Sequence, residues 1–328
     1  MPLGEEMSGP GPKFSVVDLF AGPGGLAEGF SSVTTASGAP AFEIELSVEK
    51  EKAAHSTLLL RTFLRRFRSR LPIEYRDYLR QGGLEPDWAK LYPGEWESAQ
   101  QDALQLELGL AETDAILDVR IDEIRNRNGG NTVLIGGPPC QAYSLAGRAR
   151  NRGIASYVAE NDPKHFLYEN YITILSRLRP AAFVMENVKG MLSSSLNSEF
   201  IFKRILADLQ EAGDGYVLIA LSPRGRQQQQ LTPSEPHPSD FILRGEEFGL
   251  PQARHRVIVV GIRQSDFDAA AVSNLGCPLT PSTSRTTVED VLGGMPRLRC
   301  GLSRQDSSAA WRKALKEAAA VCVFGRGA

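Results

Sequence analysis

VVDLFAGPGGL, residues 16–26, runs from a β-branched, apolar stretch into a turn that carries three glycines. Glycine adopts positive φ readily and lets a backbone approach a ligand closely, so Gly22, Gly24 and Gly25 predict a strand–turn–helix unit with a ligand against the turn. Glu49 ends the next apolar run about twenty residues further on, where an acidic residue can hold ribose hydroxyls. The combination indicates a nucleoside-containing cofactor without saying which one.

Short apolar runs alternate with helical patterns along the rest of the chain. This alternation is typical of a parallel sheet with helices on both faces. The predicted strands are residues 14–19, 42–48, 132–135, 182–185, 216–221 and 256–262. Residues 199–212 have apolar positions at three- and four-residue steps and are followed by Gly213, so a helix is predicted there.

The composition, with 42% hydrophobic and 23% charged residues in a chain of 328, is that of an ordinary globular protein. A net charge of −2 gives no global nucleic-acid signature, so any case for DNA binding depends on particular sites. The four cysteines are too scattered for a metal motif or a disulfide framework, which favours a reducing cytosol and no metal. No apolar run reaches membrane-spanning length, and residues 1–13 lack a signal peptide's apolar segment and are expected to be flexible.

Two stretches interrupt the alternation. Residues 55–115 form an insertion of helical character, in which arginines are interleaved with aromatic and aliphatic residues. One interpretation is a basic nucleic-acid face; the other is a helix pair that buries Leu64, Phe67 and Tyr75 and exposes its arginines. Residues 222–240 are polar and proline-rich, which predicts a surface loop without chemistry of its own.

Three further segments carry chemistry. GGPPCQAYS, residues 136–144, holds a single thiol, Cys140, directly behind two prolines that fix its entry angle. One interpretation of Cys140 is a small buried apolar side chain, the most common role of a free cysteine. The other is a thiolate that attacks the substrate covalently, as methyl transfer to a poorly nucleophilic carbon requires. Glu186 and Asn187 end an apolar strand, where side chains face the ligand crevice of a parallel sheet. Arg254 and Arg256 alternate to one side of an extended segment, so both can aim at one anion or at Glu186.

In combination these segments resemble the DNA (cytosine-5-)-methyltransferase family. The resemblance spans residues 14–263 and rests on four ordered motifs at residues 18–25, 137–141, 186–188 and 252–256. It implies a doubly wound α/β fold of the class I, Rossmann-like methyltransferase type, with a mostly parallel seven-stranded sheet over residues 14–275. The implied cofactor is S-adenosylmethionine, with S-adenosylhomocysteine as its product.

The resemblance also implies roles for individual residues. Cys140 is expected to add to carbon 6 of cytosine while Glu186 acts at ring nitrogen 3, with Arg254, Arg256 and Asn187 completing the catalytic group. The residues expected to bind the cofactor are Phe20, Gly22, Pro23, Gly24, Gly25, Leu26, Glu49, Lys50, Asp118, Val119, Pro139 and Leu167. Lys50 stands where the family often has an aromatic residue, a departure that removes the usual stacking contact.

Reaction on both faces of the ring requires a cytosine flipped out of duplex DNA. The stretch after Cys140 then looks like a mobile lid; a disordered basic surface loop is the alternative interpretation. The residues expected to contact DNA there are Gln141, Ser144, Arg148, Arg150 and Arg152.

Beyond Ile262 we find no match to the family's target-recognition domain or to its final motif. Residues 276–328 are therefore predicted to be a connection toward a target-recognition domain that has been cut off. The alternative is a split enzyme in which a second polypeptide recognises the target sequence. The favoured function is DNA methylation in a prokaryotic cytosol, in restriction–modification or another defence system. A tRNA-directed cytosine methyltransferase and a non-catalytic fragment or subunit are the alternatives.

Overall fold

The structure, a computed structural model, describes residues 13–67, 70–82, 84–139, 167–193, 195–196, 199–222, 237–270, 279–295 and 301–324. The chain divides into two compact units, residues 1–285 and residues 286–328. The sheet and the candidate site belong to the first unit.

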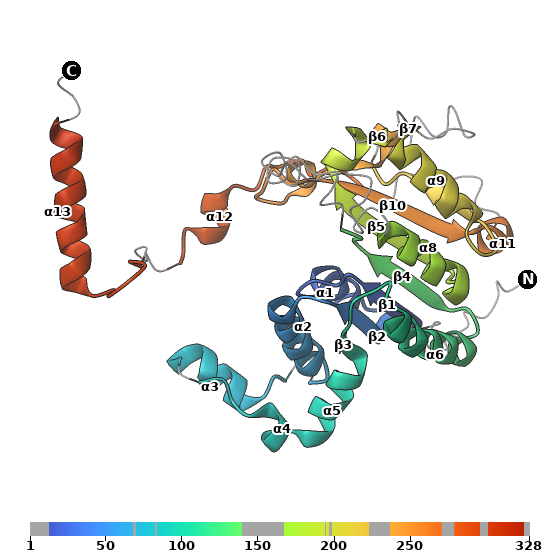
Figure 1. Cartoon of the computed structure of the whole chain (residues 1–328), viewed down its shortest axis with the longest axis horizontal. Coiled ribbons are helices and arrows are strands. Elements are labelled where there is room, and N and C mark those ends of the chain that lie inside the picture. Colours follow the sequence, from blue (N-terminus) through green and yellow to red (C-terminus); the bar gives the residue numbers. More distant parts are fainter. Residues whose placement is uncertain are drawn as a thin grey trace, which may run out of the picture. The chain divides into compact units, whose positions relative to one another are not determined.

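An eight-stranded sheet lies at the centre of the first unit (Figure 1). Seven strands follow the order β3-β2-β1-β4-β5-β10-β8, and β9 pairs separately with β10. The strands are β1 (Phe14–Leu19), β2 (Phe42–Glu49), β3 (Ala103–Gln105), β4 (Thr132–Gly136), β5 (Ala182–Val188), β8 (Tyr216–Ile219), β9 (Ile242–Arg244) and β10 (His255–Arg263). The pairs from β3 through β5 are parallel, and β10 is antiparallel to β5, β8 and β9. The predicted mostly parallel seven-stranded sheet is confirmed, with β9 as a short addition.

Helices cover both faces of this sheet. Successive side chains of a strand point to opposite faces, so Val16 joins a smaller core beneath α1, whereas Val17 and Leu19 join the larger core beneath α6, α8 and α9. These helices are α1 (Gly25–Ser31), α6 (Ala111–Asn128), α8 (Leu167–Leu178) and α9 (Ile201–Glu211). Short segments complete this unit: η3 (Lys189–Ser193), the pair β6 (Ser195–Leu196) and β7 (Glu199–Phe200), η4 (Pro238–Phe241), η5 (Gly245–Phe248) and α11 (Gln264–Ala269).

Glycines set how closely the central strands approach one another. A methyl group on Gly136 would lie 2.5 Å from the carbonyl oxygen of Leu19, and one on Gly261 would lie 2.0 Å from the Phe183 ring. No larger residue fits either position without a shift of the backbone or of the ring. The close approach at Gly136 brings the carboxyl ends of β1 and β4 together, and both site motifs begin there.

The insertion between β2 and β3 consists of α2 (Lys52–Arg65), α3 (Ile73–Gln81), α4 (Trp88–Leu91) and α5 (Pro93–Asp102). Its own apolar cluster is built around Phe63, Trp88 and Ala99, with Leu64, Phe67 and Tyr75 packed against it. These last three side chains, which the second interpretation predicts to be buried, are partly buried. The predicted extent of 55–115 is wrong at its end, because β3 and the start of α6 lie inside that range.

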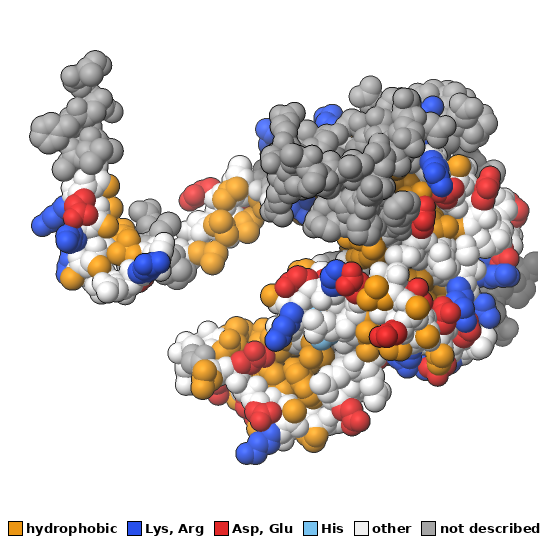
Figure 2. Space-filling view, viewed as in Figure 1, with side chains coloured by type: hydrophobic (Ala, Val, Ile, Leu, Met, Phe, Trp, Pro, Cys, Tyr) orange, Lys and Arg blue, Asp and Glu red, His pale blue; other side chains and the backbone are white. Residues whose placement is uncertain are grey.

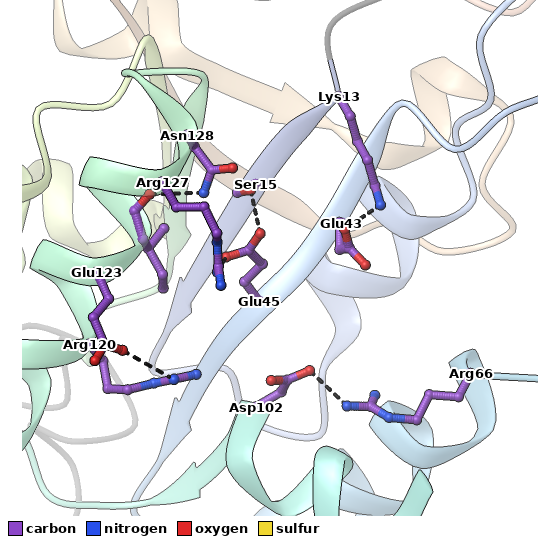
Figure 3. A network of polar contacts seen from close by, with 11 residues as sticks. Lys13, Ser15, Glu43, Glu45, Arg66, Asp102, Arg120, Glu123, Arg127 and Asn128 are labelled. Atoms are coloured by element: carbon purple, nitrogen blue, oxygen red, sulfur yellow. Dashed lines mark hydrogen bonds and ion pairs between the residues drawn. The ribbon is translucent and has the colours of Figure 1, made fainter. Parts of the chain in front are cut away.

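Polar contacts join α6 to β2 and hold the helices of the insertion together (Figure 3). Arg66 at the end of α2 binds the Asp102 carboxylate at 2.8 Å and the Ser98 hydroxyl at 2.6 Å, both on α5. Arg127 of α6 pairs with Glu45 of β2, which also accepts a hydrogen bond from Ser15 at 2.6 Å. The Arg66–Asp102 pair, which is largely shielded from water, closes the insertion directly before β3 begins.

The second unit contains α12 (Val288–Leu292) and α13 (Ser308–Phe324). Thr287 begins α12 with a reciprocal pair of cap hydrogen bonds to Asp290. Val288, Val291 and Met295 are exposed, and none of the buried core side chains in the described part of the chain comes from this unit. Among the described helices, none is long and apolar enough to cross a membrane.

Candidate functional site

The site motifs meet at the carboxyl ends of β1, β2, β4 and β5. In an open α/β sheet this edge is where ligands bind. β1 leads into the glycine turn at residues 20–25, β2 ends in Glu49, β4 leads into Gly137–Pro139, and β5 ends with Glu186, Asn187 and Val188. Strand β5 is longer than predicted, and both polar residues belong to its ladder with β10.

The glycine turn has an unusual backbone that β2 holds in place. Phe20, Gly22 and Gly24 all have positive φ, at 55°, 56° and 88°, and Phe20 is a side-chain-bearing residue in a conformation that normally marks a functional constraint. The Gly22 N–H donates to Glu49 Oε2 at 2.8 Å, and the Glu51 N–H donates to Oε1 at 2.6 Å. Glu49 is therefore fixed against the glycine turn, and its role as a ribose-binding acid stays a prediction.

Helix α2 of the insertion braces the other side of the glycine turn. A methyl group on Gly24 would lie 3.0 Å from Leu58 Cδ1, and Arg61 donates to the Pro23 carbonyl at 3.1 Å. One turn further along α2, Arg65 pairs with Glu28 of α1 at 3.1 Å. Burial lowers the pKa of Arg65, and Glu28 opposes that effect. Arg65 and Arg66 therefore form intramolecular ion pairs, which weakens the interpretation of this helix as a basic nucleic-acid face.

Asp18, one residue before the end of β1, is completely buried. Neither carboxylate oxygen has a hydrogen-bond partner among the described residues. Burial raises the pKa of Asp18 to about 8, an effect that the nearby Arg65 opposes and the nearby Glu49 reinforces. A buried, unsatisfied carboxylate is costly in a free protein, so the group fits a site whose ligand supplies positive charge or hydrogen-bond donors.

The turn has room for such a ligand. A methyl group on Gly22 or Gly25 would meet no atom within 4 Å, so the backbone there faces open space. S-adenosylmethionine combines a ribose with two cationic groups. Ribose hydroxyls match Glu49, and positive charge matches Asp18, so the residues present fit that cofactor.

A side chain of β5 holds the segment Gly137–Pro139 in place through a hydrogen bond. Asn187 is buried, donates its amide N–H to the Pro138 carbonyl at 3.0 Å, and accepts a hydrogen bond from the Val188 N–H at 2.8 Å. Because both ends of the amide are used, Asn187 fixes the backbone two residues before Cys140. Cys140 and the predicted DNA contacts Gln141, Ser144, Arg148, Arg150 and Arg152 lie outside the described residues.

The Glu186 carboxylate lies against the same segment. A methyl group on Gly137 would be 3.0 Å from Glu186 Oε2, whereas Oε1 lies 2.6 Å from Arg256 Nε, an ion pair whose N–H direction is not that of a hydrogen bond. Arg254 is exposed and has no ion pair among the described residues. The alternation correctly predicts that an arginine of this pair reaches Glu186, and the structure selects Arg256.

The remaining predicted cofactor residues are distributed unevenly. Pro23 and Leu26 lie on the turn and the first residues of α1, and Pro139 and Leu167 flank the undescribed segment. Asp118 and Val119 are not brought to this edge. Both are in the body of α6, where Asp118 pairs with Arg177 of α8 at 2.8 Å and Val119 is 59% exposed.

Strand β3 supplies neighbours of Glu49 that sequence reasoning missed. Gln105 lies opposite Glu49 in the parallel register, and the Leu106 N–H donates to the Glu49 carbonyl at 3.1 Å. Lys50, a predicted cofactor residue, pairs with Glu107, two residues after the end of β3.

Asp18 is a second residue that sequence reasoning missed. Its signal was a charged side chain inside a strand that is otherwise mostly apolar. Within the described ranges, no group of three or more His, Cys, Asp or Glu residues could hold a metal ion.

Comparisons with known proteins identify the family to which the chain is similar. A family model described as C-5 cytosine-specific DNA methylase matches residues 94–316. The type II methyltransferase M.Bpa9945I of Bacillus paralicheniformis is 30% identical over 308 residues, which are 87% of this chain and 61% of that protein. The type II methyltransferase M.XorII of Xanthomonas oryzae pv. oryzae is 29% identical over 56% of this chain and 35% of its own length. The chain thus spans less than two thirds of either relative.

A solved structure of a prophage-encoded protein from E. coli has the same fold. It superimposes with a TM-score of 0.52 and 20% identity, over 90% of this chain and 59% of that one. At this level of identity the likeness supports the sheet and its helices, not the chemistry.

Proposed function

The chain belongs to the C-5 cytosine-specific DNA methylase family, and on that premise we propose that it transfers a methyl group from S-adenosylmethionine to carbon 5 of cytosine in duplex DNA. The observation that carries the proposal is the arrangement around Gly137. Glu186 lies against this glycine, Arg256 holds the carboxylate, and Asn187 fixes Pro138, so the chain enters Cys140 from a constrained position beside an acid.

The chemistry that this arrangement supports begins at carbon 6 of the cytosine. The Cys140 thiolate adds there, and Glu186, at ring nitrogen 3, provides a proton or hydrogen bond that takes up the developing negative charge. Carbon 5 of the resulting enamine is then nucleophilic enough to accept a methyl group. Loss of the carbon 5 proton expels the thiolate and restores the aromatic ring. Arg256 keeps the Glu186 carboxylate oriented toward the base throughout.

The cofactor, when bound, supplies the methyl group as an electrophile. We assign its ribose to Glu49 and its cationic end to the neighbourhood of Asp18, with Gly22, Gly24 and Gly25 forming the turn against which it lies. Phe20, Pro23 and Leu26 complete the wall of that site. Gln105 and Leu106 at the end of β3 replace Asp118 and Val119 as the residues proposed beside the nucleoside.

The substrate and the biological setting are further parts of the proposal. Reaction at both faces of the ring requires a flipped cytosine, with Arg148, Arg150 and Arg152 contacting phosphates. Because the relatives are type II methyltransferases, we assign the protein to restriction–modification in the cytosol. Recognition of the target sequence is assigned to residues outside the sheet unit or to a second polypeptide.

A covalent trap tests the proposed function. Duplex DNA containing 5-fluorocytosine is incubated with the protein and S-adenosylmethionine, and cross-linked peptides are mapped by mass spectrometry. Fluorine at carbon 5 cannot leave as a cation, so a competent enzyme stays attached to the DNA. We expect the adduct at Cys140 and its complete loss in Cys140→Ser, with cofactor binding retained.

Two comparisons sharpen this test. Faster methyl incorporation into tRNA than into duplex DNA would replace the substrate assignment, and absence of an adduct with either nucleic acid would contradict the proposed catalysis. Glu49→Ala is expected to weaken S-adenosylmethionine binding in calorimetry by roughly tenfold or more, since it removes both the ribose acceptor and the hydrogen bond to Gly22. An unchanged dissociation constant would remove Glu49 from the site.

A further inference from the structure

The start of β10 belongs to a closed loop that begins at β9. The two strands pair antiparallel, with His255 opposite Arg244 and Arg256 opposite Leu243. Between them, the Gly245 N–H donates to the Arg254 carbonyl at 3.0 Å, and the Leu250 N–H donates to the Gly245 carbonyl at 3.1 Å. These hydrogen bonds close residues 244–255 into a backbone ring, and Arg256 follows directly after it. The rigidity of this ring therefore determines where the Arg256 guanidinium lies.

One side-chain contact crosses that ring. His255 Nε2 lies 2.7 Å from Glu246 Oε1, and the two side chains are 32% and 23% exposed. The contact of the carboxylate with its own backbone N–H, reinforced by the hydrogen bond to His255, lowers the pKa of Glu246, so it is an ionised acceptor at neutral pH. The other oxygen, Oε2, is buried and has no partner among the described residues.

His255 and Arg256 are consecutive residues of a strand, so their side chains leave it on opposite faces. On one face Glu246 holds His255; on the other, Arg256 Nε lies 2.6 Å from Glu186 Oε1. A strand end that is held on one face cannot rotate about its own axis without breaking that hold. The contact at His255 therefore limits the motion of the guanidinium on the opposite face.

We propose that Glu246 and His255 are positioning residues for the methyl transfer, and that their contact fixes the end of β10 so that Arg256 holds the Glu186 carboxylate toward the base. This inference rests on the proposed function. Neither side chain touches substrate or cofactor; both act through Arg256. The contact joins a residue of the segment that links β9 to β10 with the first residue of β10.

Matched variants separate this role from simple loop stability. Glu246→Ala removes the acceptor, whereas Glu246→Gln keeps an oxygen that His255 can still donate to. His255→Gln places a donor nitrogen close to the position of Nε2, whereas His255→Asn is too short to reach. Glu247→Ala is the control, because Glu247 is the next residue, is half exposed and pairs only loosely with Arg244 at 3.4 Å.

The first readout is the single-turnover rate of adduct formation with 5-fluorocytosine DNA, with the dissociation constant for S-adenosylmethionine measured alongside. We expect Glu246→Ala and His255→Asn to slow adduct formation by roughly 10- to 100-fold, the penalty typical of a misplaced catalytic group, while cofactor affinity stays unchanged. The two Gln variants and Glu247→Ala are expected to stay close to wild type. Wild-type rates in both Glu246→Ala and His255→Asn would overturn the inference.

A second readout needs no turnover. In protein labelled with 15N-arginine, solvent exchange of the Arg256 Nε–H is expected to be slow and to accelerate about tenfold in Glu246→Ala and in His255→Asn, because loss of the held geometry exposes the ion pair to water. Unchanged exchange in either folded variant, judged by intact cofactor binding, would overturn the inference. If wild-type protein forms no adduct although Arg256 exchange responds as expected, the proposed function fails, and with it the role in methyl transfer, whereas the hold of the His255–Glu246 contact on Arg256 stands.

Discussion

The carboxyl group of Asp18 is held inside the protein without a hydrogen-bond partner among the described residues. Its burial raises the pKa to about 8, whereas an aspartate in an unfolded chain ionises near pH ~4. Between these two values the native protein keeps a proton that the unfolded chain has released. Stability therefore falls as the pH rises through this window, the opposite of the behaviour of an ion-paired aspartate.

Asp18→Asn tests this residue, since the amide has nearly the same shape and does not titrate. In the absence of cofactor, we expect wild-type protein to lose stability relative to the variant as the pH rises from about 4 to about 8, by at most about 1.4 kcal/mol per pH unit. Urea unfolding of both proteins at pH 5 and pH 8 measures the difference. A stability difference that is independent of pH would show that the Asp18 pKa is not raised.

At the scale of elements, the insertion α2–α5 packs against the glycine turn at residues 20–25 through α2. It lies at the lower left of Figure 2, where apolar side chains are exposed over its surface. Its aromatic cluster holds α2 in place, and α2 in turn contacts Pro23, Gly24 and Glu28. The insertion thus supports the glycine turn through α2, the helix of the insertion that contacts it.

Phe63→Ala is the change that best tests this support. The Phe63 ring contacts the rings of Phe67, Trp88 and Trp96, with centroids 5.1, 5.2 and 5.4 Å away. We expect a loss of about 3–5 kcal/mol in unfolding free energy and weaker S-adenosylmethionine binding, because α2 loses its anchor. Calorimetric titration and urea unfolding measure both effects.

Leu84→Ala serves as the control, because this side chain is 95% exposed and its removal leaves the cluster intact. We expect no change in stability or in cofactor affinity for this variant. A Phe63→Ala protein that is less stable yet binds the cofactor with wild-type affinity would mean that the glycine turn is held without the insertion.

The elements also show how far the sequence could predict the structure. Long β-branched runs predicted six strands, because burial on both faces of a parallel sheet leaves a continuous apolar pattern. The three-residue β3, Ala-Leu-Gln, has no such pattern, and its pairing with β2 is set by the path of the insertion. Because β3 was not predicted, the residues beside the nucleoside were assigned to Asp118 and Val119 instead of to the end of β3. The sequence pattern does not show that α6 has already begun at Ala111 and contains both residues.

For the site, the motifs correctly predicted which residues lie together: the glycine turn with Glu49, and the Gly137–Pro139 segment with Glu186 and Asn187. Strand alternation placed Arg254 and Arg256 on one side but could not choose between them. That choice depends on the register between β5 and β10, which is a tertiary property. Similarly, a helical pattern could not reveal that Arg65 and Arg66 are neutralised by Glu28 and Asp102 from other elements.

At the scale of the whole molecule, the described chain consists of a sheet unit and a helical unit, with the boundary at Arg285. The buried side chains of the described residues all lie in the first unit, whereas α12 and α13 expose Val288, Val291 and Leu315. The apolar burial that stabilises folding is therefore concentrated before residue 286.

A chain that ends at Arg285 is expected to unfold in urea with the same midpoint as the full chain and to bind S-adenosylmethionine with the same affinity. The reason is that the contacts of the glycine turn with Glu49 and α2, and of Glu186 with Arg256, lie within that unit. A lower midpoint for the shortened chain would show that residues 286–328 contribute to the stability of the sheet.

The position of β10 has a consequence for biosynthesis. It is the last of the described sheet strands to leave the ribosome, yet it lies in the sheet's interior, between β5 and β8. A nascent chain that has emerged only as far as β8 leaves the hydrogen-bonding edge of β5 without its final neighbour, the state in which strand edges are most prone to pair with other chains. Arg256 is carried on this same strand, so translation of one nine-residue segment closes the sheet and gives Glu186 its partner in a single step.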